Sequence, residues 1–174
     1  MKEKNIIHFI FTGGTIDSHY DSTKDTVIPN MHSVIPEYLK QLKLYTKLKF
    51  TEVCMKDSRN LTSRDLKAIS DAIEKSPSKM IIVIHGTYTI PRTARYLNKN
   101  LNRKDQKIIL TGSMIPLKGF DFTDASFNLG YAIANVKSVK DGIYVAMNGK
   151  LFNANEVAKN LSEGRFYSIL KNVK

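Results

Sequence analysis

Three short loops of glycine and hydroxyl residues carry the clearest chemistry in this chain. They are Thr12-Gly13-Gly14-Thr15, His85-Gly86-Thr87 and Thr111-Gly112-Ser113. A threonine hydroxyl becomes a useful nucleophile when a base removes its proton and N–H groups stabilise the oxyanion. Glycine lets a substrate come close to such backbone N–H groups. Taken alone, the loops fit either nucleophilic catalysis or ordinary turns, because glycine and threonine are also common turn residues.

Each of these loops follows a short apolar run. The runs are Asn5–Phe11, Met80–Ile84 and Lys107–Leu110, and segments with helical patterns lie between them. Short apolar runs that alternate with helices predict parallel strands of an α/β sheet. In such sheets, ligands bind beyond the carboxyl ends of the strands. We therefore expect the three loops to converge on one site.

The remaining segments complete this alternation. Further strands are predicted at 47–55 and 142–147, and helices at 33–42, 62–75, 90–98 and 124–136. Ser33 and Thr62 are the expected N-caps, the latter with Asp65 in an approximate capping box. The polar segment Asp17–Asn30 is long for a connection, which is typical of a functional lid loop, and 151–174 is ambiguous. The expected fold class is α/β, with a doubly wound, mainly parallel sheet flanked by helices in one domain.

The composition is typical of a globular protein and excludes several other classes. Of 174 residues, 42% are hydrophobic and 25% are charged, which suits one domain with a real core. The net charge is +11, but the basic residues are scattered, so we expect a basic surface without a specific nucleic-acid partner. Cys54 is the single cysteine and no zinc spacing is present, so no disulfide, metal or cofactor is expected. No apolar run is long enough for a membrane span or a signal peptide, which favours a cytoplasmic protein.

Several motifs together resemble those of the bacterial-type L-asparaginase/glutaminase family. Thr12-Gly13-Gly14-Thr15-Ile16 is similar to the family's TGGTI signature. His85-Gly86-Thr87-Tyr88-Thr89 resembles its HGTDT signature, and the segment from Thr111 to Pro116 resembles its TGAMRP-like segment. The motifs occur in the family's order, and the resemblance covers nearly the whole chain. It implies an asparaginase N-domain-like fold with a flavodoxin-like strand order.

The resemblance also implies an activity and a set of site residues. Thr15 matches the nucleophile that attacks a side-chain carboxamide, forms an acyl-enzyme and releases ammonia. Thr87 matches the second catalytic threonine, and Lys159 matches the lysine paired with it. The substrate-binding positions implied are Gly14, Ser58, Arg59, Gly86, Tyr88 and Ser113, with Tyr20 and Thr26 on the lid.

This chain departs from the family's pattern in three places. Tyr88 stands where the signature has an aspartate that binds the substrate's α-ammonium group, so this recognition is weakened or lost. Arg59 stands where a small or amide side chain is usual, and a guanidinium can grip a carboxylate with paired hydrogen bonds. An arginine that points to solvent is the alternative at this position. The family's smaller C-terminal domain has no counterpart, so residues 1–174 are expected to form a single catalytic domain.

Three functions remain open from the sequence. The leading one is an amidohydrolase that acts on a small carboxamide, and family likeness implies a homo-oligomer, either a dimer or a tetramer. The second is a catalytically weak or inactive module that binds or regulates through the same crevice. The third is a phosphate or nucleotide binder, which ranks last because the P-loop lysine pattern is missing. The joint presence of Thr15, Thr87 and Lys159 favours the enzyme.

Overall fold

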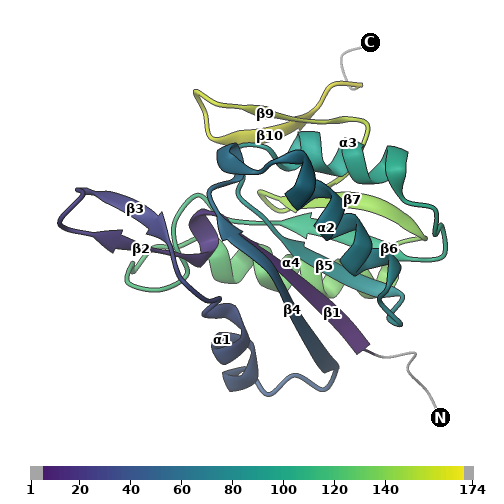
Figure 1. Ribbon diagram of the computed structural model, residues 1–174, viewed down its shortest axis with the longest axis horizontal. Helices are drawn as coiled ribbons and strands as arrows, with labels where there is room; N and C mark the ends of the chain where they lie inside the picture. Colours follow the sequence, from purple (N-terminus) through teal and green to yellow (C-terminus); the bar gives the residue numbers. More distant parts are fainter. Residues whose placement is uncertain (1–5, 171–174) are drawn as a thin grey trace.

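A six-stranded, mostly parallel sheet forms the centre of the molecule (Figure 1). The computed structural model describes residues 6–170. In spatial order the strands are β4 (Lys47–Lys56), β1 (Ile6–Gly13), β5 (Met80–Ile84), β6 (Lys107–Thr111), β7 (Gly142–Met147) and β8 (Lys150–Asn153). All neighbours pair in parallel except β7 and β8, which are antiparallel. The α/β prediction is confirmed, and the parallel strands follow the flavodoxin-like order.

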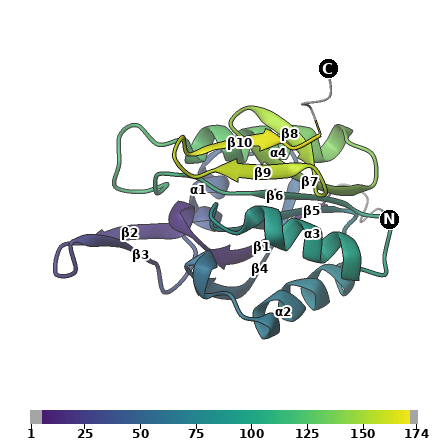
Figure 2. The same cartoon turned by 90° about the horizontal axis from the view of Figure 1, so that it is seen from above.

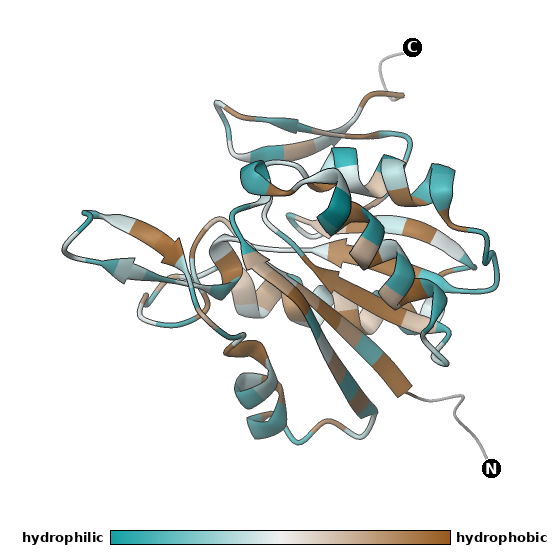
Figure 3. Cartoon of the chain, in the orientation of Figure 1, coloured by the Kyte–Doolittle hydropathy of each residue, from teal (hydrophilic) through white to brown (hydrophobic). Residues whose placement is uncertain are grey.

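Four helices cover the two faces of this sheet. They are α1 (Ile35–Gln41), α2 (Ser63–Glu74), α3 (Ile90–Asn100) and α4 (Ala125–Ser138). Helices α2 and α3 pack on one face, and α1 and α4 pack on the other (Figure 2). Successive residues of a strand point to opposite faces, so Ile81 and Val83 enter the first core while Ile82 and Ile84 enter the second. This two-sided burial explains why β5 is apolar throughout, as Figure 3 shows.

The predicted elements agree closely with the observed ones where local signals are strong. Strands 80–84 and 142–147 have the predicted bounds, and β6 includes Thr111 in addition to the apolar run Lys107–Leu110. Asn5 of the first predicted strand lies outside the described residues. Thr62 caps α2 in a complete capping box with Asp65. The expectation for Ser33 is wrong, because α1 starts at Ile35 with Val34 as its N-cap. The Val34 N–H is instead bound by the carboxylate of Asp17, at 2.9 Å.

The predicted lid loop is a β-hairpin that projects from the body (Figure 1). Its strands are β2 (Ser18–Asp21) and β3 (Thr26–Pro29). Asp21 closes the turn, since its carboxylate accepts hydrogen bonds from the Thr23 backbone N–H and hydroxyl at 2.9 and 2.6 Å. Most of the hairpin is exposed on both faces, so it lacks the apolar alternation by which a strand is recognised in a sequence.

A second hairpin occupies the part of the chain whose structure the sequence left ambiguous. It consists of β9 (Val157–Asn160) and β10 (Arg165–Ser168), which lie beside α3 (Figure 1). Arg95 of α3 donates to the Val157 carbonyl oxygen at 2.8 Å. The Phe166 N–H donates to the Asn148 side chain at 3.0 Å, and the Phe166 ring is buried in the α2–α3 core. These contacts position β9, and with it Lys159, relative to the loops that follow the parallel strands.

Candidate active site

The three glycine loops meet at the carboxyl ends of β1, β5 and β6, as the sequence predicts. A Cβ placed on Gly14 would lie 2.4 Å from Gly86 Cα and N, and one placed on Gly112 would lie 2.2 Å from the His85 carbonyl oxygen. Neither distance is possible for a real side chain, so only glycine permits this approach. The His85 N–H also donates to the Thr111 carbonyl oxygen at 2.9 Å. The loops therefore form one closely packed floor.

A cavity of about 240 Å³ lies over this floor. All three candidate catalytic residues, Thr15, Thr87 and Lys159, line it. Most of the candidate substrate-binding residues line it as well, namely Gly14, Ser58, Arg59, Gly86 and Tyr88. Segments from both ends of the chain thus contribute to a single cavity.

Thr87 and Lys159 are in direct contact in this cavity. Lys159 Nζ donates a hydrogen bond to Thr87 Oγ1 at 2.7 Å. The Thr87 hydroxyl in turn faces the Met114 sulfur at 3.5 Å. Thr15 is the first residue of the 3₁₀ turn η2 (Thr15–Asp17). It directly follows Gly14, whose φ of 85° and ψ of 175° suit glycine alone. The glycine conformation thus sets the direction in which Thr15 enters the cavity.

Two opposing effects act on the protonation of Lys159. Burial is the larger and lowers the pKa of its amine, while the charge of Asp124 raises it. Asp124 stands at the start of α4, and its carboxylate accepts from the Met114 and Ile115 N–H groups at 3.0 and 3.1 Å. The same carboxylate holds the loop after β6 in place. The net lowering makes the neutral amine more accessible than it is in water.

Arg59 is held by a neighbour that the sequence analysis did not single out. Its Nε and Nη2 donate to the two carboxylate oxygens of Asp57 at 3.0 and 2.6 Å. Its guanidinium lies 5.7 Å from the centre of the Tyr88 ring. The Arg59 hydrogen bonds lower the pKa of Asp57. Arg59 is therefore paired with Asp57 and lies over the Tyr88 ring at the cavity, while 64% of its side chain remains exposed to solvent.

Asp57 and Met114 are lining residues that the sequence analysis missed. Asp57 could have been found from its residue type in a loop, because an aspartate side chain often accepts a hydrogen bond from the backbone N–H two residues later. Asp57 does so with the Arg59 N–H at 2.8 Å and thereby caps the 3₁₀ turn η3 (Ser58–Asn60). Met114 carried no comparable signal, because a methionine after Gly112-Ser113 has no polar chemistry to mark it.

Ser113, Tyr20 and Thr26 do not line the cavity. Ser113 is fully buried, and its hydroxyl donates to the Ile115 carbonyl oxygen. Tyr20 lies on the projecting hairpin with 52% of its surface exposed, and its hydroxyl donates to Asp25. Thr26 is exposed on β3 of the same hairpin. In this conformation the hairpin stands apart from the cavity.

His85 is a structural residue of the floor. It is completely buried, and burial lowers its pKa to about 4. Nδ1 lies 2.9 Å from the Gly86 carbonyl oxygen, and Nε2 lies 3.0 Å from Thr93 Oγ1. A carbonyl oxygen only accepts, so Nδ1 is assigned the proton and Nε2 accepts from the threonine hydroxyl. Both ring nitrogens are thereby occupied in fixing the second glycine loop.

Neither a metal-binding cluster nor a membrane-spanning helix is found in the part of the chain that the structure describes. Within residues 6–170, no three His, Cys, Asp or Glu side chains gather in a way that could hold a metal ion. Over the same residues, no helix has the length and apolar character needed to cross a bilayer.

Comparison with known proteins places these motifs in a family. Residues 6–167 match the family described as "Asparaginase, N-terminal". The glutaminase-asparaginase of Acinetobacter glutaminasificans is 27% identical over 91% of this chain and 51% of its own length. L-asparaginase 1 of Escherichia coli (strain K12) is 26% identical over 93% of this chain and 49% of its own.

Solved structures support the same placement. The "probable cytoplasmic L-asparaginase" of Campylobacter jejuni superposes with a TM-score of 0.78 and 28% identity, covering 95% of this chain and 53% of that one. The chain thus spans about half the length of the relatives and of the structure that it matches.

Proposed function

This chain belongs to the asparaginase family, and we propose that it is an amidohydrolase that releases ammonia from the side-chain carboxamide of a small substrate. The observation that carries the proposal is the 2.7 Å contact between Lys159 Nζ and Thr87 Oγ1 in the cavity that Thr15 also lines. A base of lowered pKa next to a hydroxyl is the arrangement that activates a weak oxygen nucleophile.

The reaction proceeds in two steps in this proposal. Thr15 Oγ attacks the carboxamide carbon, the C–N bond breaks, and ammonia leaves with the proton lost by the hydroxyl. Water then attacks the acyl-enzyme ester and releases the acid. Lys159 in its neutral form takes up and returns the proton through Thr87, across their hydrogen bond. Backbone N–H groups of the floor other than those of Gly14 and His85, which donate to the Lys56 and Thr111 carbonyl oxygens, stabilise the oxyanion of each tetrahedral intermediate.

The departures at positions 59 and 88 shape the substrate in the same proposal. Tyr88 brings an uncharged phenol to the cavity. Arg59 keeps N–H donors free beyond those used by Asp57, and these donors suit a substrate carboxylate. The substrate is therefore asparagine or a related carboxamide that carries an acid group.

Ammonia release by the purified protein tests the proposal. Asparagine, glutamine and carboxamides without an α-amino group would be compared for the native protein and for Thr15→Ala and Thr87→Ala. Thr46→Ala is the matched control, because Thr46 also accepts a lysine hydrogen bond, from Lys137 at 2.6 Å, but on the exposed surface. We expect loss of about 100-fold or more in the two cavity variants and full activity in the control.

Two results would contradict this mechanism. If Thr15→Ala keeps its activity, Thr15 is not the nucleophile. If the native protein is silent on every carboxamide yet binds them, the ligand-binding module is the better description. Mass spectrometry of the protein quenched during turnover provides a direct check, because the acyl group would be found on the peptide that contains Thr15.

A further inference from the structure

A groove of about 530 Å³ lies along helices α2 and α3 and shares no lining residue with the candidate active site. Both helices cover the same face of the sheet (Figure 2). The groove is lined from both helices, by residues that include Ser63, Leu66, Arg92, Arg95, Tyr96 and Lys99. Its volume falls within the range of small-molecule binding sites. We call it the α2–α3 groove.

Three cations of the groove share one face of α3. Arg92, Arg95 and Lys99 are spaced by three and four residues, and all three are exposed. Residues at this spacing lie one above the other on a helix. The seven residues from the first to the last rise about 10 Å along the helix axis. The three positive charges therefore lie along one short line.

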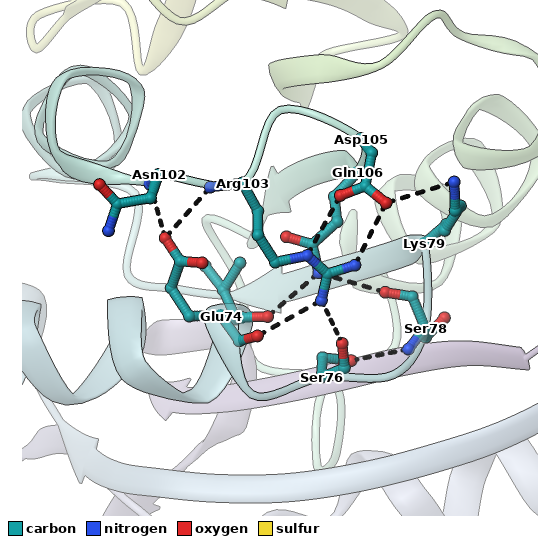
Figure 4. Close-up of polar contacts among 9 residues, drawn as sticks. Glu74, Ser76, Ser78, Lys79, Asn102, Arg103, Asp105 and Gln106 are labelled. Carbon is teal, nitrogen blue, oxygen red and sulfur yellow. Dashed lines mark hydrogen bonds and ion pairs between the residues drawn. The ribbon is translucent and has the colours of Figure 1, made fainter.

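No carboxylate among the described residues lines the groove. Helix α3 has no aspartate or glutamate. In α2, Asp65 and Asp71 form ion pairs at 2.8 and 3.1 Å with lysines outside the groove. Glu74 accepts from the backbone N–H groups of Asn102 and Arg103 at 2.6 and 3.3 Å (Figure 4). The groove therefore presents positive charge, and the chain's net charge of +11 strengthens its attraction for anions.

Arg95 connects the groove to the hairpin that carries Lys159. Its Nη1 donates to the Val157 carbonyl oxygen at 2.8 Å, and Val157 and Lys159 both belong to β9. A guanidinium has several further N–H donors, which remain for a ligand. A donor that the protein already orients loses less conformational freedom when a ligand binds. An anion held by Arg95 would therefore also steady β9.

Tyr96 adds an aromatic surface beside the three cations. Its side chain is half-buried and packs against the α2–α3 core, so the ring is held in place. A nucleobase can stack on such a ring, because every base has an aromatic face. Arginine recognises phosphate oxygens with paired hydrogen bonds. A ring next to a short line of cations thus suits a molecule that joins a base to a chain of phosphates.

We propose that the α2–α3 groove binds a nucleoside diphosphate or triphosphate, and that the bound ligand steadies β9 through Arg95. The phosphates lie on Arg92, Arg95 and Lys99, and the base packs on the ring of Tyr96. The groove goes beyond the proposed amidohydrolase function and does not depend on it. The ligand acts as an effector at this site and not as a substrate.

Calorimetric titration with ADP tests the site, in the absence of divalent cations. Inorganic pyrophosphate and adenosine would be titrated separately, because they represent the two parts of the ligand. We expect ADP to bind the native protein more tightly than either part. Arg92→Gln should weaken ADP binding by about 10-fold or more, because it removes a charge-assisted contact. Lys99→Gln, an independent substitution of an exposed residue, should also weaken it.

Arg64→Gln is the matched control for general attraction to a basic surface. Arg64 is exposed on α2 next to Ser63 but does not line the groove, so its loss should change ADP binding by less than about 2-fold at physiological salt. No binding of ADP, or equal losses in Arg64→Gln and Arg92→Gln, would overturn the proposal. Loss of binding in Arg59→Gln would place the anion in the candidate active site instead. Tighter binding of a single-stranded oligonucleotide than of ADP would assign the groove to nucleic acid. Either of these results would also overturn the proposal.

Hydrogen exchange measures the link to β9. ADP should slow exchange of the backbone amides of residues 157–168 by about 3-fold or more in the native protein, and Arg95→Gln should lose this effect. Unchanged exchange with ADP bound would refute the link through Arg95. Neither experiment measures ammonia release, so failure of the groove proposal and failure of the proposed amidohydrolase are distinguishable.

Discussion

Replacement of Gly14 by alanine would test whether close packing of the glycine loops builds the site. The new Cβ would lie 2.4 Å from Gly86 Cα and N, whereas ordinary contact begins at 3.4 Å. The obstacle is backbone and not a flexible side-chain end, so overpacking would cost about 1–3 kcal/mol. Gly14 also has a φ of 85° and a ψ of 175°, a conformation that costs any other residue roughly 1–3 kcal/mol. The free energy of unfolding should therefore fall by about 2–6 kcal/mol.

Gly119→Ala is the matched control for this substitution. Gly119 has a φ of 87°, close to that of Gly14, but a Cβ there would meet nothing within 4 Å. It should therefore lose only the backbone contribution, on the order of 1–3 kcal/mol. The difference between the two variants isolates the contact between the first and second loops.

Urea unfolding followed by circular dichroism measures both variants. For Gly14→Ala we expect the transition midpoint to move down by about 1 M or more, with an unchanged slope. If the two variants lose the same stability within about 0.5 kcal/mol, the first and second loops are not in close contact and do not form a shared floor. A parallel loss of ammonia release would tie the same contact to Thr15, which directly follows Gly14.

Two predictions concern pH. Burial lowers the pKa values of His8 and His85 from 6.5 to about 4. Between pH 4 and 6.5 the unfolded chain therefore binds more protons than the folded chain. The free energy of unfolding should fall as the pH falls, by up to about 1.4 kcal/mol per pH unit for each histidine. Urea midpoints from pH 7 to 4 check this, and His8→Gln should reduce the slope. The pKa of Lys159 is lowered by burial and raised by Asp124, so Asp124→Asn should shift the acid limb of kcat/KM to lower pH; a shift to higher pH would contradict that assignment.

The fold could be predicted from the sequence wherever the signals are local. Apolar runs such as Met80–Ile84 are buried on both faces of the sheet, so their composition alone marks them as central strands. The cap at Thr62 depends only on a residue three positions away. The projecting hairpin at 18–29 could not be predicted in this way, because neither of its faces has a consistent apolar pattern.

For the candidate site too, the sequence indicates some residues, but it does not determine where their side chains point. Thr15, Gly86 and Thr87 could be proposed from the sequence, because each lies within a few residues of a strand end and parallel strands bring those ends to one edge. Ser113 shows the limit of that reasoning, since it also follows a strand yet turns its hydroxyl to the Ile115 carbonyl oxygen. Position after a strand places a residue near the site but does not determine where its side chain points.

The sequence by itself determined the α/β class, the order of the elements and the convergence of the glycine loops, because periodicity and turn chemistry act over a few residues. Only the tertiary structure decided which side chains meet. Lys159 reaches Thr87 from 72 residues away through a hairpin that the sequence left ambiguous. The Arg59 guanidinium lies 5.7 Å from the centre of the Tyr88 ring, which comes from the loop after β5. Such contacts depend on how separate segments pack together, and the same packing buries the Lys159 amine and lowers its pKa.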